Sequence, residues 1–168
     1  VERKEFLKMM KSPENISQRV REMFHAGDLF RLIPEFSALD KLPEGERAMG
    51  HISTQAEHSV TALEVLEGLP DNILSVSRDE GVVLIKEQIR SIIAELKSAG
   101  IFYLLRLAVL LHDIGKARAA KGAVDPGHDE FGGYEIAPGI LERLGLSRKE
   151  QGKISKLISN DDILMFFT

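Results

Sequence analysis

A histidine and an aspartate stand side by side at the end of the most apolar stretch of the chain. Residues 104–111 read LLRLAVLL, His112 and Asp113 follow directly, and Lys116 lies three residues further on. A carboxylate buried beside an imidazole is costly unless a charged partner compensates it. His nitrogen and Asp oxygen are both good ligands for divalent metal ions. The pattern therefore indicates a metal site, and the plainer alternative is a helix that simply ends in polar residues.

The macrodipole of a helix helps to choose between these two interpretations. At a helix C-terminus the partial negative charge favours a histidine such as His112 but disfavours an aspartate such as Asp113. The mismatch favours a functional site. Gly115 permits a turn directly after the pair, and Lys116 adds a positive charge.

A second helix offers another histidine. Thr54 and Glu57 form a capping-box pattern, which predicts a helix that begins there and carries His58 in its first turn. A lone histidine in an amphipathic helix is more often a surface residue or a satisfied core residue. Next to a helix that ends in His-Asp, however, His58 becomes a candidate third ligand.

Two further candidates lie in the C-terminal half. His128 precedes a predicted helix and follows a basic loop that contains Gly and Pro, and a solvent-exposed loop histidine is its alternative. Asp161 and Asp162 follow Asn160 near the end of the chain. A carboxylate pair at a helix C-terminus is mildly unfavourable, so these two residues also stand out.

The composition limits the classes of protein to consider. A chain of 168 residues is long enough for one domain with its own core. The absence of cysteine excludes disulfides, thiolate zinc sites and cysteine nucleophiles, and agrees with a reducing, cytoplasmic location. The net charge of −4 gives no electrostatic case for nucleic acid as a partner. The longest apolar run is far shorter than the ~18 residues of a membrane helix, so we expect no membrane association.

Hydrophobic spacing predicts helices throughout the chain. We expect them over residues 2–11, 13–25, 54–66, 79–98, 101–111 and 129–144, and from 147 onward. Ser12-Pro13 is expected to start the second helix, Gly68 and Pro70 to stop the third, and Pro138 to kink the sixth. Residues 40–53 and 117–127 are expected to be loops, and no segment alternates convincingly as a strand. The predicted fold class is all-α.

The histidines and the His-Asp pair carry a resemblance to a known family. His58, then His112-Asp113 within LLHDIGK, then His128 ahead of Gly132 resemble the HD superfamily of metal-dependent phosphohydrolases. The resemblance covers residues 50–168, and HDIGK is its most specific part. Within the superfamily, the similarity is greatest to the bacterial bifunctional PII uridylyltransferase/uridylyl-removing enzymes. It is carried by HISTQAEH (51–58), LERLGLS (141–147) and residues 157–165. Residues 6–36 resemble the helical linker that precedes the HD domain in those enzymes. The related helical domain of tRNA nucleotidyltransferases is less close.

The resemblance implies an HD-domain helical bundle whose facing helices hold one or two divalent metal ions (Mn, Mg, Co, Fe or Zn). The metal ligands that it implies are His58, His112, Asp113 and His128, with Asp113 the residue to bridge two ions. It also implies catalytic roles for Asp113, for Lys116 at the substrate phosphate, and for His51 near the mouth of the site. It further implies that residues 1–50 form a helical leader on the core and residues 51–168 the metal-binding domain.

The sequence departs from the family pattern at Asn160-Asp161-Asp162, where the relatives usually place a histidine. We take Asp161 as the replacement ligand and Asp162 as the alternative. A carboxylate at this position favours harder ions such as Mn²⁺ or Mg²⁺ over Zn²⁺. A further aspartate that many members carry has no counterpart before Thr168, and the apolar end of the chain suggests a fragment of a longer protein.

Together with the candidate ligands, the resemblance implies a metal-dependent phosphohydrolase that acts on a nucleotide or on a nucleotidylated regulatory protein. Removal of UMP from a PII-type protein is the sharpest form of this hypothesis. Lys116, and more weakly Arg118, would offset the charge that builds on the phosphoryl oxygens. The alternative is an HD-type sensor domain that binds nucleotide or metal without turnover. A third hypothesis, an RNA-facing helical domain, conflicts with the acidic net charge.

Overall fold

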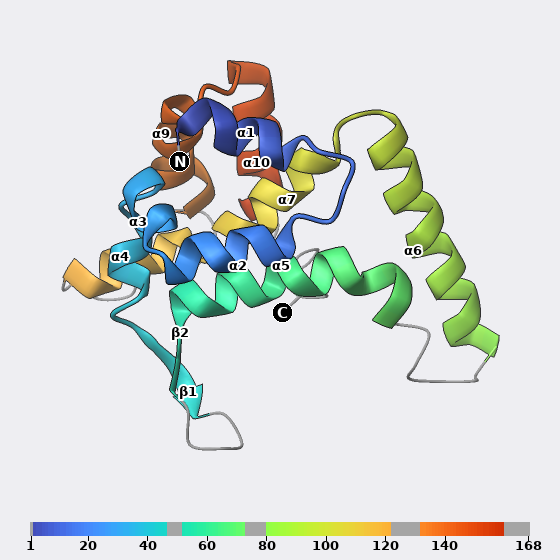
Figure 1. Cartoon of the computed structure of the whole chain (residues 1–168), viewed down its shortest axis with the longest axis horizontal. Coiled ribbons are helices and arrows are strands. Elements are labelled where there is room, and N and C mark those ends of the chain that lie inside the picture. Colours follow the sequence, from blue (N-terminus) through green and yellow to red (C-terminus); the bar gives the residue numbers. More distant parts are fainter. Residues whose placement is uncertain (1, 47–51, 73–79, 122–131, 160–168) are drawn as a thin grey trace.

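The computed structural model describes residues 2–46, 52–72, 80–121 and 132–159, and it confirms the all-α class (Figure 1). The helices of the N-terminal half are α1 (Arg3–Met10), α2 (Ser17–His25), α3 (Asp28–Leu32), α4 (Phe36–Leu39) and α5 (Gln55–Asn72). The second half contains α6 (Glu80–Ser98), α7 (Phe102–Leu111), the 3₁₀ helix η2 (Ile114–Lys121), the π-helical turn η3 (Gly132–Ile136), α9 (Ala137–Arg143) and α10 (Arg148–Ser159).

Helix α7 is the centre of the core. Nine of its ten residues are buried, among them Leu107 and Leu110, and a helix that is apolar nearly all round must be enclosed by other elements. It packs against α5, α10 and α1. Leu63 and Leu66 bring the buried face of α5 into the same core. Because α7 is enclosed, its C-terminal end and the residues that follow it lie among other helices.

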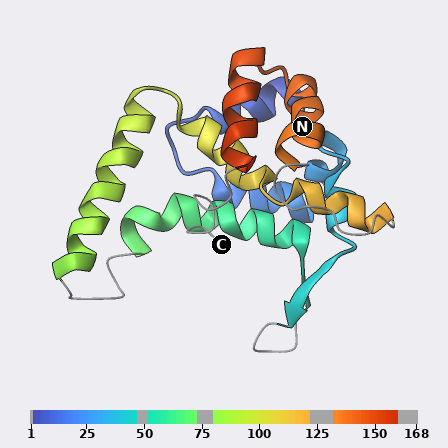
Figure 2. The ribbon, with the colours of Figure 1, turned by 180° about the vertical axis from the view of Figure 1, so that it is seen from behind.

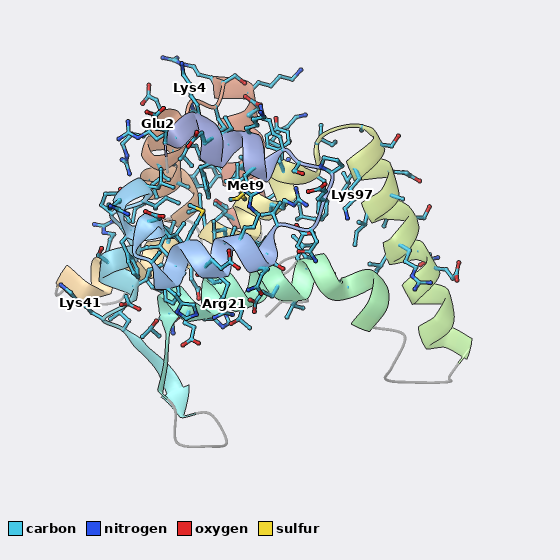
Figure 3. All side chains as sticks on the ribbon, in the orientation of Figure 1. Glu2, Lys4, Met9, Arg21, Lys41 and Lys97 are labelled. Carbon is cyan, nitrogen blue, oxygen red and sulfur yellow. The ribbon has the colours of Figure 1, made fainter. Side chains whose placement is uncertain are left out.

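Helix α6 stands away from this body on one side of the molecule, as both ribbon views show (Figures 1 and 2). Among its described side chains only Ile93 is buried, whereas Ile92 is 55% exposed. Near its C-terminal end, Lys97, labelled in Figure 3, places its ammonium over the ring of Phe102. No helix in the described part of the chain is both long and apolar enough to cross a membrane.

The predicted start of the second helix at Ser12-Pro13 is wrong, because α2 begins only at Ser17. The guanidinium of Arg106 donates hydrogen bonds to the main-chain oxygens of Met10, Ser12 and Glu14 at 2.6–2.7 Å. These oxygens point into the core instead of along a helix axis. A long-range contact therefore overrides the local start signal.

The predicted start of α5 is confirmed, and its predicted end is wrong. The main-chain N–H of Glu57 donates to Thr54 Oγ1 at 3.1 Å, and the helix begins at Gln55. The helix then continues past Gly68 and Pro70 to Asn72. A glycine costs a helix only about 1 kcal/mol, and the burial of nearby side chains such as Leu69 outweighs it. A proline two residues before the end removes a single helical hydrogen bond.

The segment 40–53 is not simply the loop that was predicted. Strands β1 (Pro43–Glu46) and β2 (Ile52–Thr54) pair antiparallel, with Pro43 opposite Thr54 and Glu46 opposite Ile52. Pairing of so few residues leaves no alternation in the sequence for a period-two pattern to reveal. The hairpin leads directly into α5, so it lies at the start of the helix that carries His58.

The C-terminal half also departs from its predicted outline. Residues 114–121 form η2 where a loop was expected from 117 onward. Pro138 lies in the first turn of α9, directly after the π-helical turn η3, and not in the interior of one long α-helix. A proline is tolerated in a first turn, where its missing N–H has no helical partner. The capping box of Ser147 with Glu150 is confirmed, with Ser147 N–H donating to Glu150 Oε2 at 2.7 Å.

Candidate metal centre

The first turn of α5 lies beside the end of α7, because the two helices pack against each other and run in opposite directions. His58 is in the first turn of α5. His112 is the C-cap of α7 and keeps helical backbone angles, and Asp113 follows it immediately before η2. The antiparallel packing thus brings together residues that are more than fifty positions apart in the sequence.

His58, His112 and Asp113 form a group that could hold a metal ion, with one candidate ligand atom from each residue and all three atoms within 4.8 Å of one another. Asp113 Oδ2 lies 3.4 Å from His112 Nε2 and 3.8 Å from His58 Nε2. The side chains of His112 and Asp113 are 4% and 5% exposed, and that of His58 is 18% exposed. The group is therefore enclosed, with one edge open at His58.

A main-chain contact sets the orientation of the His112 ring. Its Nδ1 lies 2.8 Å from the carbonyl oxygen of Val109, and because a carbonyl oxygen only accepts, Nδ1 must carry the hydrogen. In the neutral imidazole this leaves the lone pair on Nε2, the atom that faces Asp113. Histidines that bind metals commonly make this second hydrogen bond to a backbone oxygen. The geometry of His112 therefore fits a metal ligand.

The two oxygens of Asp113 have different surroundings. Oδ1 accepts a hydrogen bond from Lys116 Nζ at 2.8 Å, whereas Oδ2 is buried and has no hydrogen-bond partner among the described residues. Leaving a buried charged oxygen unsatisfied costs more than leaving a neutral one unsatisfied. A cation beside Oδ2 and the two imidazole Nε2 atoms would remove that cost. The donor set therefore fits a divalent metal ion.

Lys116 is also held by Gln55, a residue that is not among the predicted site residues. Its Nζ donates to Gln55 Oε1 at 3.0 Å, and its main-chain N–H donates to the Asp113 carbonyl at 2.9 Å. Gln55 lies three residues before His58, so both belong to the same face of α5. This spacing is the signal for Gln55 that the sequence contains, although the capping box is formed by its neighbours Thr54 and Glu57.

The structure brings together four of the predicted site residues, His58, His112, Asp113 and Lys116. The other predicted ones, His51, His128, Asp161 and its alternative Asp162, lie outside the described residues. Arg118, the weaker candidate for phosphate contact, pairs with Glu135 Oε2 at 2.8 Å on the surface. Its described ion pair is therefore with a carboxylate outside the group around Asp113.

Comparison with known proteins gives a distant relative. The chain is 28% identical over 153 residues to the bifunctional uridylyltransferase/uridylyl-removing enzyme of Rhodospirillum rubrum, a match that covers 91% of this chain. The chain spans only 14% of the length of that relative. No protein-family model matches the chain, and no solved structure gives a significant match. The similarity agrees with the relative expected from the sequence, and membership of the HD superfamily stays a prediction.

Proposed function

We propose that the chain is a metal-dependent phosphohydrolase domain. One observation carries the proposal: a buried aspartate turns one oxygen to a lysine and the other toward two imidazole nitrogens. The second oxygen, Asp113 Oδ2, has no hydrogen-bond partner among the described residues. A cation between this oxygen and the two imidazoles would compensate the buried carboxylate.

Three atoms would hold the metal ion: His58 Nε2, His112 Nε2 and Asp113 Oδ2. A divalent ion supplies a Lewis acid and acidifies water at neutral pH. His51, His128 and Asp161 are proposed to complete the site, with one or two ions bound. The carboxylate ligands favour Mn²⁺ or Mg²⁺ over Zn²⁺.

Lys116 would contact the phosphoryl group of the substrate. An ammonium has three N–H donors, and the described contacts to Asp113 and Gln55 use two of them. The side chain is 20% exposed, so the third donor can reach a ligand at the surface of the site. A fixed cation there stabilises the negative charge that develops on the phosphoryl oxygens.

The proposed substrate is a phosphoester of a nucleotide or of a nucleotidylated protein, and most specifically a PII-type protein that carries UMP. The support is a match of 28% identity, which covers 91% of this chain, to a relative whose name includes a uridylyl-removing activity. We propose no membrane and no nucleic acid as a partner.

The experiment is a metal-reconstitution assay. Protein stripped of metal with a chelator should hydrolyse bis(p-nitrophenyl) phosphate, or release UMP from a uridylylated PII-type protein, only after Mn²⁺, Co²⁺, Mg²⁺ or Zn²⁺ is returned. His112→Ala should lower the rate at least a hundredfold, and the matched control His25→Ala, at the end of α2, should leave it unchanged. Hydrolysis that survives both the chelator and His112→Ala would rule out the proposal.

A binding domain without turnover is the second candidate. The departure at Asn160-Asp161-Asp162 from the histidine that the relatives carry is the observation that favours it. This candidate predicts that the protein binds Mn²⁺ through His112 and Asp113 but hydrolyses none of the phosphoesters in the same assay.

A further inference from the structure

Gln55 faces the candidate site from the first residue of α5. The residue is only 9% exposed, and its side-chain oxygen accepts a hydrogen bond from Lys116 Nζ at 3.0 Å. We infer that Gln55 is a positioning residue, which holds the Lys116 ammonium on the Oδ1 side of Asp113 and aims it at the phosphoryl group of the substrate. The inference rests on the proposed function.

Lys116 is fixed at three points. Its Nζ bonds Asp113 Oδ1 at 2.8 Å and Gln55 Oε1 at 3.0 Å, and its main-chain N–H bonds the Asp113 carbonyl at 2.9 Å. A lysine side chain is flexible, and holding its head in one place costs about 2 kcal/mol of rotamer entropy. Two acceptors, one in α5 and one in the turn that follows α7, meet this cost before any ligand binds.

Without Gln55, only Asp113 would hold the ammonium. Nothing in the remaining described contacts would then keep Nζ on Oδ1 and away from Oδ2, the oxygen proposed for the metal ion. An ammonium at Oδ2 would repel a divalent cation over a short distance in a buried site. Gln55 therefore separates two positive charges on one carboxylate.

The amide is suited to this task because it is neutral. An ammonium only donates hydrogen bonds, so the group that faces it must be the amide oxygen, which accepts without adding charge. A glutamate at position 55 would hold the lysine equally well but would neutralise it. The positive charge that a phosphate needs would then be lost.

The backbone of Gln55 is itself anchored. Its N–H donates to the Leu42 carbonyl at 2.9 Å, and its carbonyl accepts from Ser59 Oγ at 3.1 Å. Thr54 next to it donates through Oγ1 to Asp40 at 2.9 Å and caps the helix. These hydrogen bonds hold the first turn of α5 in place, and with it the relative positions of Gln55 and His58.

The test is a double-mutant cycle on the full chain. Wild type, Gln55→Leu, Lys116→Ala and the double variant are compared by calorimetry, first for Mn²⁺ binding to metal-free protein and then for inorganic phosphate binding to Mn²⁺-loaded protein. Gln55→Leu should weaken phosphate binding about tenfold, the scale of one hydrogen bond to a charged group. It should weaken Mn²⁺ binding about threefold. In the Lys116→Ala background, Gln55→Leu should change neither affinity, because Gln55 acts through Lys116.

Two further variants separate this role from a merely structural one. Gln55→Glu should weaken phosphate binding but strengthen Mn²⁺ binding, an opposite pair of changes that a loss of packing does not produce. Gln151 lies in α10, and its side-chain Nε2 donates to the Leu146 carbonyl at 2.8 Å. As the matched control, Gln151→Leu should leave both affinities unchanged.

The inference is overturned if Gln55→Leu leaves phosphate affinity within twofold of wild type, or if its effect persists unchanged beside Lys116→Ala. Either result leaves the proposed function standing when wild type binds Mn²⁺ and hydrolyses phosphoesters. A wild type that binds no metal ion overturns the proposed function and this inference together.

Discussion

Helices α5 and α7 bury a charged group at each of two places along their contact, and the two places are built differently. Towards the end of α5, Glu67 meets Arg106 in the middle of α7. At the start of α5, His58 meets His112 and Asp113 at the end of α7. Both places combine a carboxylate with nitrogen groups, yet they differ in how completely the protein satisfies the charges.

The Arg106 place is closed by the protein itself. Arg106 is 1% exposed, its Nε donates to Glu67 Oε1 at 2.5 Å, and its two terminal nitrogens donate to three main-chain oxygens of residues 10–14. A buried ion pair survives when such additional hydrogen bonds satisfy the remaining donors. The N-terminal segment thereby becomes part of the core.

The Asp113 place is not closed in this way. Glu67 Oε2 also lacks a partner, so an unpaired buried oxygen does not by itself mark a metal site. The difference is the direction of the neighbouring nitrogens. Arg106 points its Nε–H donor at Glu67, whereas His112 turns its N–H away to Val109 and, in the neutral imidazole, presents a lone pair. The lone pair of His112 and the carboxylate of Asp113 thus lie beside His58 in a group that could hold a metal ion.

Replacing the arginine should give the largest effect. Arg106→Met leaves Glu67 buried without its partner and strips three carbonyl oxygens of their donors, so we expect a loss of about 3–5 kcal/mol in the free energy of unfolding. Urea denaturation followed by circular dichroism measures it. The double variant Arg106→Met, Glu67→Met should regain part of the loss, because it removes the unpaired charge. A single-variant loss below about 1 kcal/mol would contradict the closed character of this place.

Asp113→Asn should have the opposite profile. The amide has the same shape but neither charge nor a strong metal-binding oxygen, so we expect Mn²⁺ affinity to fall at least a hundredfold, about 2.8 kcal/mol. The free energy of unfolding of the metal-free protein should stay within about 1 kcal/mol of wild type or rise, because removal of the charge on the unsatisfied Oδ2 offsets the loss of the Lys116 ion pair. Calorimetry and urea denaturation give the two numbers. Unchanged Mn²⁺ affinity would show that Asp113 is not a ligand.

The same contrast explains what the sequence could predict. The candidate site could be predicted from the chain alone because its central residues are contiguous: an apolar helix ends in His112 and Asp113, and Lys116 follows. His58 could be added to the candidates because Thr54 predicts the first turn of its helix. In both cases the informative signals lie within a few residues of the site.

Arg106 and Gln55 show why the rest could not be predicted. In the sequence Arg106 is only an interruption of an apolar run, and its partners at Met10, Ser12 and Glu14 are more than ninety residues away. The partner atoms are main-chain carbonyl oxygens, which every residue has, so the residue types give no signal of the contact. Gln55 gains its meaning only from Lys116, sixty-one positions later. Tertiary contacts of this kind also explain why the predicted start of α2 was wrong.

Metal binding should itself stabilise the protein. A ligand that binds only the folded state adds about 2.7 kcal/mol to the free energy of unfolding when its concentration is a hundred times Kd. We therefore expect Mn²⁺ to raise the melting temperature of wild type and of Arg106→Met alike, and to leave Asp113→Asn unmoved. Differential scanning calorimetry with and without a chelator measures the shift. An equal shift in Asp113→Asn would place the binding elsewhere.

The smallest effect concerns a third contact of α7, to α10, which differs from both places because it is partly open to solvent. The Tyr103 hydroxyl donates to Glu150 Oε1, and Lys11 Nζ lies 3.8 Å from the same oxygen. The hydrogen bonds from Ser147 and then from Tyr103 lower the pKa of Glu150 to about 2. Burial and this hydrogen bond raise the pKa of Tyr103 to about 12, so the hydroxyl is protonated and can donate at neutral pH.

Tyr103→Phe should therefore cost about 1 kcal/mol in the free energy of unfolding at pH 7, since one hydrogen bond to a carboxylate is lost. Because folding lowers the pKa of Glu150, its contribution is present above the usual value of 4.5 and is lost as the pH falls toward 2. The difference between wild type and Tyr103→Phe in urea denaturation should thus shrink over that range. The control is Tyr134→Phe, because Tyr134 is 61% exposed. It should not differ from wild type in the free energy of unfolding at either end of that pH range. A Tyr103→Phe deficit that stays constant from pH 6 to pH 3 would mean that the hydroxyl stabilises the fold independently of the charge on Glu150.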